Sequence, residues 1–156
     1  MRKCKTIGKI ENGVTDMKHI LIVDDNKANL TSAKMALSDM YKTTAVVSGM
    51  QALKFLEKNI PDIILLDINM PEMDGFEVME KMKEMPDCSN IPIIFLTADN
   101  DVETEQRCLE AGALDFIAKP FVPGIMRSRI GRILELEDLR KSLANRLDEK
   151  IKEVSD

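Results

Sequence analysis

The sequence predicts an α/β fold: a five-stranded parallel sheet, doubly wound with helices on both faces, plus a long extended last helix. Short apolar runs typical of buried strands recur along the chain, and between them apolar residues recur at helical spacing. Parallel strands are joined by right-handed crossovers, which place helices on both faces. A length of 156 residues with 44% hydrophobic residues suits one domain with a substantial core and an appendage.

The strands are predicted where apolar or β-branched runs stop at an acid or a turn residue. The first run, 20–23, stops at two acids, and the second, 43–47, stops before Gly49. The third, 63–66, is apolar throughout, which is typical of a strand buried on both faces. The remaining two strands are expected at 92–97 and 114–118.

The helices are predicted between these strands from apolar residues three or four positions apart. In the third helix, Phe76, Met79 and Met82 share one face and are interpreted as core. The fourth helix has the fewest apolar positions, so we expect it to be the least firmly packed and the easiest to move. The expected bounds are 30–40, with Met40 on the apolar face, 50–59, 76–85 and 101–111.

Composition excludes several classes of function. The net charge is -5 and the sequence has no basic cluster, which argues against a nucleic-acid-binding body. Cys4, Cys88 and Cys108 form no CxxC pair, so reduced thiols are expected, with Cys108 in the core. No apolar run approaches the roughly 18 residues of a membrane span, and no signal-peptide stretch is present. We therefore expect a soluble cytoplasmic protein without direct contacts to nucleic acid or membrane.

The two ends of the chain differ from the body. Residues 1–17 show neither a helical nor a strand period of apolar residues, which predicts a flexible leader. A helix is expected from Val122 to about Val154. Exposed leucines beyond the sheet mark a partner surface, so we expect 128–156 to be a dimerising linker; a tail that folds back or frays is the alternative. Its apolar positions are 3.6 residues apart on average, which favours a straight or slightly right-handed bundle: Leu136, Leu139, Leu143, Leu147, Ile151 and Val154.

Acids follow two of the predicted strands. Asp24 and Asp25 follow the first strand, and Asp67 follows the third. Because ligands of open parallel sheets bind at the carboxyl ends of the strands, Asp67 is a candidate site residue, although an acid there could also cap the next turn. Three converging carboxylates repel one another unless a cation joins them, and oxygen ligands suit Mg2+ or Mn2+ better than zinc.

Thr97 and Lys119 stand at the ends of the fourth and fifth strands. A hydroxyl, an ammonium and a divalent cation around one carboxylate form a site for a phosphoryl group, because all three stabilise charge on its oxygens while the carboxylate attacks in line. Taken singly, Thr97 could be an ordinary strand-end residue and Lys119 a surface lysine. Like the acids, both residues stand at the ends of predicted strands, and this shared placement favours the phosphoryl site.

Four segments of the sequence resemble the receiver (phospho-acceptor) domain of two-component response regulators. They are the acid pair after ILIV, LLDINMPEMDGFE around Asp67, FLTA around Thr97 and DFIAKPF around Lys119. The resemblance covers about residues 18–127. It implies a flavodoxin-like sheet in the order 2-1-3-4-5 and a cis peptide bond between Lys119 and Pro120.

The resemblance also implies a regulatory domain that phosphorylates and dephosphorylates only itself, rather than an enzyme. A sensor histidine kinase would be the partner that supplies the phosphoryl group from its phosphohistidine. The implied roles are Asp67 as phospho-acceptor, Asp24, Asp25, Asp67 and the backbone carbonyl of Asn69 as Mg2+ ligands, Thr97 and Lys119 as phosphoryl ligands, and Phe116 as the switch residue.

The implied switch draws Thr97 inward on phosphorylation and lets Phe116 fill the vacated space, which changes the 97–121 surface and the C-terminal helix. Asp99 is expected to orient the water that hydrolyses the phosphate. The charged helical tail resembles that of receivers joined to cyclic-dinucleotide enzymes or kinases, which predicts an output domain beyond Asp156. A single-domain regulator is the alternative.

Three other classes fit the sequence less well. A Mg2+-dependent phosphatase or phosphotransferase with an aspartyl-phosphate intermediate would use the same ions, but the sequence has no DxDxT-like motif and little length for a substrate-covering cap. A purely structural coiled-coil protein is at odds with the apolar strands. A sensor kinase is disfavoured because the only histidine, His19, starts a strand and is interpreted as structural.

Overall fold

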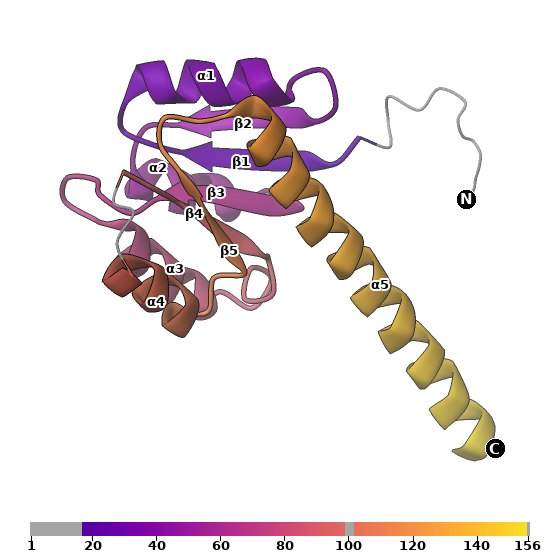
Figure 1. Cartoon of the computed structure of the whole chain (residues 1–156). Helices are drawn as coiled ribbons and strands as arrows, with labels where there is room; N and C mark the ends of the chain where they lie inside the picture. The colour runs from indigo at the N-terminus through magenta and orange to yellow at the C-terminus, as the bar shows by residue number, and fades with distance from the viewer. Residues whose placement is uncertain (1–16, 99–101, 156) are drawn as a thin grey trace.

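The structure is a computed structural model that describes residues 17–98 and 102–155 (Figure 1). Five parallel strands form one sheet in the order β2-β1-β3-β4-β5, which confirms the predicted fold and strand order. The strands are β1 (His19–Val23), β2 (Lys42–Val46), β3 (Ile63–Asp67), β4 (Ile93–Thr97) and β5 (Asp115–Ala118). The helices are α1 (Lys27–Leu37), α2 (Gly49–Leu56), α3 (Gly75–Lys83), α4 (Val102–Ala111) and α5 (Pro123–Ser155).

Strand β3 lies at the centre of the sheet, between β1 and β4. All five of its residues are buried, and successive side chains enter opposite cores. Ile63 and Leu65 pack with residues of α1 and α5, whereas Ile64 and Leu66 pack with residues of α2 and α3. The unbroken apolar run of this strand is therefore explained by a sheet covered on both faces.

Polar residues in the strand–helix turns start three of the helices. Asn26 caps α1, and Ser48 Oγ accepts the backbone N–H of Gln51 at the start of α2, 3.1 Å away. At α3, Asp74 and Glu77 form a capping box in which each side chain accepts the backbone N–H of the other. Such caps typically contribute about 0.5–2 kcal/mol each. They set where the chain leaves each strand and turns into a helix.

Three helices end before their predicted bounds, α1 and α2 by three residues and α3 by two. Helix α1 ends at Leu37, and Met40 is 52% exposed because its N–H turns back to the Leu37 carbonyl, 3.0 Å away. Helix α2 ends at Leu56, where the side-chain amide of Asn59 donates to the Phe55 carbonyl at 3.0 Å. Local hydrogen bonds of this kind compete with continued helix, and apolar spacing does not reveal them.

Helix α4 is the least buried helix of the body. Cys108 is the one buried residue among its ten, as expected for a core thiol in a lightly packed helix. The guanidinium of Arg107 lies 4.1 Å from the centre of the Phe76 ring, which links α4 to α3. Residues 99–101, and with them Asp99, lie outside the described residues, as does the predicted leader apart from Met17.

Helix α5 packs on the body with its first third and then extends away from it (Figure 1). Its buried residues are confined to the beginning: Met126, Ile130, Ile133 and Leu134. Lys18 forms an ion pair with Asp138, 2.9 Å long, close to the point where the helix leaves the sheet. The 33 residues, about 50 Å of helix, confirm the predicted long last helix and begin at Pro123.

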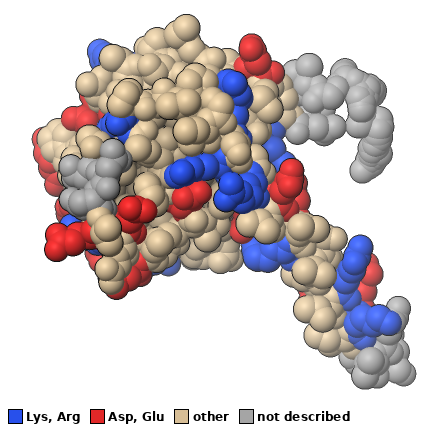
Figure 2. Space-filling model, in the orientation of Figure 1, with Lys and Arg blue, Asp and Glu red and all other residues tan. Residues whose placement is uncertain are grey.

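In the described ranges, no helix combines the length and the apolar content that crossing a membrane requires. On the face seen in Figure 2, Lys and Arg side chains lie among Asp and Glu side chains. The charge on that face is therefore mixed.

The β3–α3 connection generates the first testable prediction. A Cβ atom on Gly75 would lie 2.5 Å from the Asp67 carbonyl oxygen and 3.0 Å from Ile68 Cα, both of them backbone atoms. Gly75→Ala must therefore displace the strand end that carries Asp67, and we expect a loss of about 1–3 kcal/mol of unfolding free energy by urea denaturation.

Gly124→Ala is the matched control, because nothing lies within 4 Å of its added Cβ. We expect that substitution to change the unfolding free energy by less than about 0.5 kcal/mol. Equal stabilities of the two variants would contradict the close approach at Gly75.

Candidate functional site

The three predicted acids meet at one edge of the sheet. Val23 pairs with Leu66, so Asp24 and Asp67 leave β1 and β3 side by side at the carboxyl ends of the strands. Asp24 is 0% exposed and Asp67 is 3% exposed, whereas Asp25 is exposed. One carboxylate oxygen from each acid lies within 4.8 Å of the other two. The predicted convergence of these acids is confirmed.

Lys119 neutralises part of this charge. Its Nζ lies 3.0 Å from Asp24 Oδ2 and 3.0 Å from Asp67 Oδ1. The residue follows β5, where its backbone N–H donates to the Thr97 carbonyl at 2.8 Å. The peptide bond from Lys119 to Pro120 is cis, as the sequence resemblance implies. One ammonium therefore faces two buried carboxylates.

Backbone N–H groups bind one oxygen of each buried acid. Asn26 N–H donates to Asp24 Oδ1 at 2.9 Å, and Asn69 N–H donates to Asp67 Oδ1 at 3.3 Å. Asp24 Oδ2 is buried, and within the described residues it receives no hydrogen bond of normal geometry. Its contact with Lys119 is therefore an ion pair rather than a well-aligned hydrogen bond. A buried carboxylate oxygen without a hydrogen bond recovers only part of the free energy that it lost on leaving water.

The electrostatics of the site act mainly on Asp67. Removal from water raises its pKa and repulsion from Asp24 adds to the rise, while Lys119 acts in the opposite direction without cancelling it. The pKa of Asp67 is raised from 3.8 to about 7. Burial alone would lower the pKa of Lys119, but its contacts with Asp24 and Asp67 outweigh burial and raise that pKa. Lys119 is therefore charged at neutral pH.

The oxygen donors fit a hard divalent cation. Mg2+ is held in proteins by one or two carboxylates and keeps several waters, so it needs a partly open site. Asp24 Oδ2 offers a buried oxygen without a hydrogen bond, and exposed Asp25 borders the open side. A cation there would offset the repulsion between the carboxylates and favour their ionised forms.

Thr97 and Phe116 lie on the two strands beyond the acids. Thr97 is the last residue of β4, is 1% exposed and pairs with Ala118. Phe116 of β5 is half-buried and pairs with Phe95. The site residues predicted at strand ends therefore stand at one edge of the sheet, on β1, β3, β4 and β5, and their chemical roles remain predictions.

Arg129 of α5 makes a contact that the sequence patterns did not reveal. Its Nη1 donates to the Phe116 carbonyl, and its guanidinium carbon lies 5.5 Å from the centre of the Phe116 ring. The same nitrogen lies 3.6 Å from Asp115 Oδ1. Arg129 therefore fastens the long helix to the strand that carries the predicted switch residue. In the sequence, Arg129 is simply a charged residue next to apolar Ile130, and this pattern is too common to predict such a contact.

The chain matches a family model described as the response regulator receiver domain over residues 20–148. It belongs to this family. The match confirms the family resemblance of the sequence motifs, and it continues along α5 well past residue 127. Phosphorylation on an aspartate and use of Mg2+ are general properties of the family.

Similar proteins differ in what accompanies the receiver. A probable cyclic di-GMP phosphodiesterase of Vibrio cholerae is 39% identical over 83% of this chain, and the chain spans only 29% of that protein. The rice two-component response regulator ORR5 is 35% identical over 86% of this chain and 99% of its own length. The receiver domain of a Pseudomonas aeruginosa sensor histidine kinase, solved with magnesium in its active-site cleft, is 32% identical at a TM-score of 0.70, over 76% of this chain and 98% of that one.

The raised pKa of Asp67 generates a prediction about stability without metal. An acid whose pKa is higher in the folded than in the unfolded state contributes stability at low pH, and this is lost as the pH rises from about 4 through about 7. In EDTA, Asp67→Asn should therefore raise the unfolding free energy at pH 8 by about 1–3 kcal/mol, and by much less at pH 4.5.

Urea denaturation at the two pH values measures this effect. Asp39→Asn, an exposed acid in the turn after α1, is the control and should change stability little at either pH. A gain for Asp67→Asn that is equal at pH 4.5 and pH 8 would rule out a raised Asp67 pKa as its cause.

Proposed function

We propose that this receiver domain accepts a phosphoryl group on Asp67 from the phosphohistidine of a sensor histidine kinase, in the presence of Mg2+. The observation that carries the proposal is the contact of buried Asp67 with Lys119, beside two further carboxylates. An acid with a cationic partner at a strand end is placed to act as a nucleophile towards phosphorus.

The transfer is a single displacement at phosphorus. A carboxylate oxygen of Asp67 forms the new P–O bond, the P–N bond breaks, and the kinase histidine leaves with the bonding electron pair. Lys119 binds one oxygen of the transferring group and Thr97 a second, so negative charge on these oxygens is stabilised by the protein. Bound Mg2+ supplies further positive charge, with Asp24, Asp25, Asp67 and the Asn69 carbonyl as the proposed ligands.

The ionisation of Asp67 connects metal binding with reactivity. The attacking carboxylate must be deprotonated, yet burial and Asp24 raise the pKa of Asp67 to about 7. Lys119 favours the charged form, and a divalent cation beside the carboxylate favours it further. Metal binding therefore increases the fraction of ionised Asp67 at neutral pH.

A regulatory role is proposed rather than catalysis on external substrates. The rival is a Mg2+-dependent phosphatase or phosphotransferase, and the enzyme name of the Vibrio relative applies to a protein of which this chain spans 29%. By analogy with that relative, an output domain beyond Asp156 is proposed. A single-domain regulator, as in the rice relative that the chain spans over 99% of its length, is the alternative.

Switching is proposed to run from Asp67 through β4 and β5 to α5. A phosphoryl group bound by Thr97 draws that side chain towards Asp67, and Phe116 moves into the space beside it. Arg129 contacts both the carbonyl and the ring of Phe116, so a movement of Phe116 changes how α5 is held. The lightly buried α4 and the 97–121 surface would shift together with it.

The part of α5 that projects from the body, residues 136–151, is proposed to pair with the same helix of a second copy. Leu136, Leu139, Leu143, Leu147 and Ile151 are between 53% and 63% exposed on one helix that projects from the body (Figure 1). A stripe of large apolar residues in water favours association with a similar stripe. Pairing would place two receivers side by side. A rotation of α5 could then be transmitted to a domain that follows Asp156.

The experiment for phosphorylation uses acetyl phosphate and Mg2+. The wild-type protein should acquire one acid-stable, base-labile acyl phosphate, and Asp67→Asn should lose it, because Asp67 is the proposed nucleophile. Asp87→Asn, in the exposed loop after α3, should be labelled as the wild type is. Undiminished labelling of Asp67→Asn would refute the assignment, and turnover of added phosphoesters would favour the phosphatase.

Sedimentation with and without beryllofluoride tests the coupling to α5. We expect phosphoryl-like occupancy to shift the monomer–dimer constant of the wild type by about fivefold or more, the usual scale of coupling between sites. Arg129→Gln should bind beryllofluoride normally but lose this shift. Arg132→Gln, an exposed arginine one turn further along, is the matched control and should retain it.

The outcomes separate the two parts of the switching proposal. A wild-type protein that stays monomeric in both states would exclude pairing through α5. A wild-type shift that Arg129→Gln retains in full would exclude Arg129 as the connection.

A further inference from the structure

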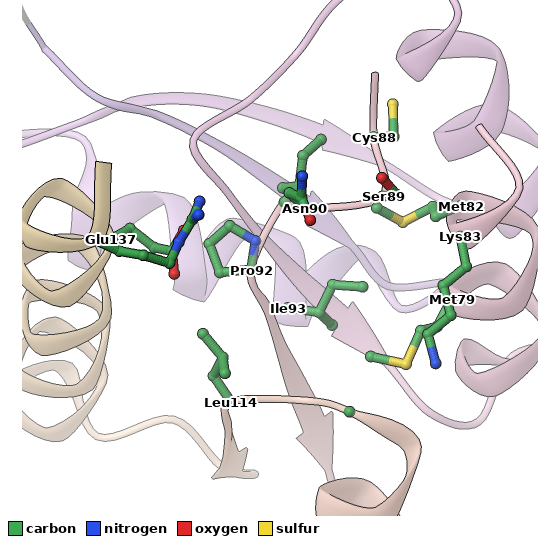
Figure 3. A pocket seen from close by; sticks show the side chains of 13 residues that line it. Met79, Met82, Lys83, Cys88, Ser89, Asn90, Pro92, Ile93, Leu114 and Glu137 are labelled. Atoms are coloured by element: carbon green, nitrogen blue, oxygen red, sulfur yellow. The ribbon is translucent and has the colours of Figure 1, made fainter. Parts of the chain in front are cut away.

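A cavity in the described residues lies away from the acids, at the amino ends of strands β4 and β5. It has a volume of about 280 Å³ and opens where α5 leaves the body. Four parts of the chain enclose it: α3, the loop before β4, the α4–β5 turn and α5 (Figure 3). Such a volume is near the lower end of small-molecule sites, so a compact ligand would fill it.

The floor of the cavity is apolar. Met79 and Met82 of α3 and Ile93 of β4 are at most 5% exposed, and they present their remaining surface to the cavity. Leu114, which is 47% exposed, forms part of the opposite wall (Figure 3). Methionine side chains are flexible and polarisable, so this floor can adapt to a flat apolar or aromatic group.

Two cations stand beside this floor. Lys83 Nζ donates one hydrogen bond to the Ala111 carbonyl at 2.9 Å, which leaves two of its three N–H donors for another acceptor. Arg140 binds Glu137 Oε1 through Nε and Nη2, at 3.2 and 3.1 Å, and retains N–H groups of its own. Because Arg140 pairs with Glu137, Lys83 leaves the rim with a net positive charge.

We propose that this cavity is a binding site for a small amphipathic anion, with an apolar, preferably aromatic, body on the methionine floor, its acidic group on Lys83, and Arg140 beside the other end of that body. Charge complementarity selects the anion, and the apolar floor selects against a fully polar one such as inorganic phosphate. The site is separate from the acids at the other ends of the strands and does not depend on phosphorylation.

Occupancy of the cavity would act on α5. Glu137 and Arg140 belong to α5, whereas Lys83 belongs to α3, so a ligand that spans the floor from Lys83 would contact both the departing helix and the body. The ligand therefore restrains α5 near the point where it leaves the sheet. Ligand binding would therefore be a second way to change the position of α5, acting at the ends of the strands opposite to Asp67.

Methyl NMR of the full chain labelled at methionine, titrated with 8-anilinonaphthalene-1-sulfonate, tests the proposal. The probe combines an aromatic body with one anionic group. We expect saturable shifts of the Met79 and Met82 methyl signals. The methyl signals of Met35 and Met50, which are 77% and 57% exposed elsewhere, should stay unchanged. The apolar stripe of α5 contains no methionine, so probe bound there does not reproduce this pattern.

Charge variants and an uncharged probe complete the design. Lys83→Gln with Arg140→Gln should weaken probe binding about tenfold or more, because the charge-assisted hydrogen bond to the sulfonate is lost. Lys81→Gln with Lys141→Gln, which removes two nearby lysines that do not line the cavity, should bind as the wild type does. N-phenyl-1-naphthylamine, which lacks the sulfonate, should bind at least tenfold more weakly.

Three results would overturn the proposal. They are shifts confined to methionines other than Met79 and Met82, equal affinity of the uncharged probe, and unchanged affinity of the Lys83→Gln, Arg140→Gln protein. The substituted side chains are exposed, and an unaltered methyl spectrum without probe verifies that the variants are folded. Binding that only a protein side chain or peptide achieves, with no response to the probe, would also exclude a small-molecule site.

Discussion

Two buried carboxylates that share one ammonium form the constraint on which the rest of the structure depends. Asp24 and Asp67 are adjacent because β1 and β3 are neighbours in register, and Lys119 reaches both from the end of β5. The charges do not balance, since exposed Asp25 adds a third acid. Burial and repulsion from Asp24 raise the pKa of Asp67, which destabilises the metal-free site and favours binding of a divalent cation. Gly75 lets the start of α3 approach the backbone of Asp67, so the position of this strand end depends on the missing side chain.

The same edge of the sheet is connected to the long helix by a few contacts. The backbone N–H of Lys119 donates to the Thr97 carbonyl, and Arg129 holds the carbonyl and ring of Phe116. A change at Asp67 therefore has a short physical path to α5 through β4 and β5. At the opposite ends of the strands, Glu137 and Arg140 of the same helix line the cavity. The proposed inputs of the domain therefore act on α5 at two places along its length.

The sequence predicted the sheet and its acids well because both depend on local patterns. A run such as Ile63–Asp67, apolar and then acidic, indicates both a buried strand and its functional end. The early stop of α1 at Leu37 was missed because a backbone turn decides it, not apolar spacing. The contact of Arg129 with Phe116 and the cavity beside Lys83 could not be predicted, because they join side chains from elements that are distant in the chain and no motif marks them. Long-range packing of this kind requires the three-dimensional structure.

The central claim is that Mg2+ binds beside an Asp67 whose pKa is raised by burial and by repulsion from Asp24, and proton release on binding tests it most directly. Calorimetric titration of Mg2+ in buffers of different ionisation enthalpy gives the number of protons released per ion. With an Asp67 pKa of about 7, the account predicts close to one proton at pH 6 and close to none at pH 8.5, and a loss of the pH 6 release in Asp67→Asn. Tight Mg2+ binding at pH 6 without proton release would contradict it, because Asp67 would then already be ionised beside Asp24.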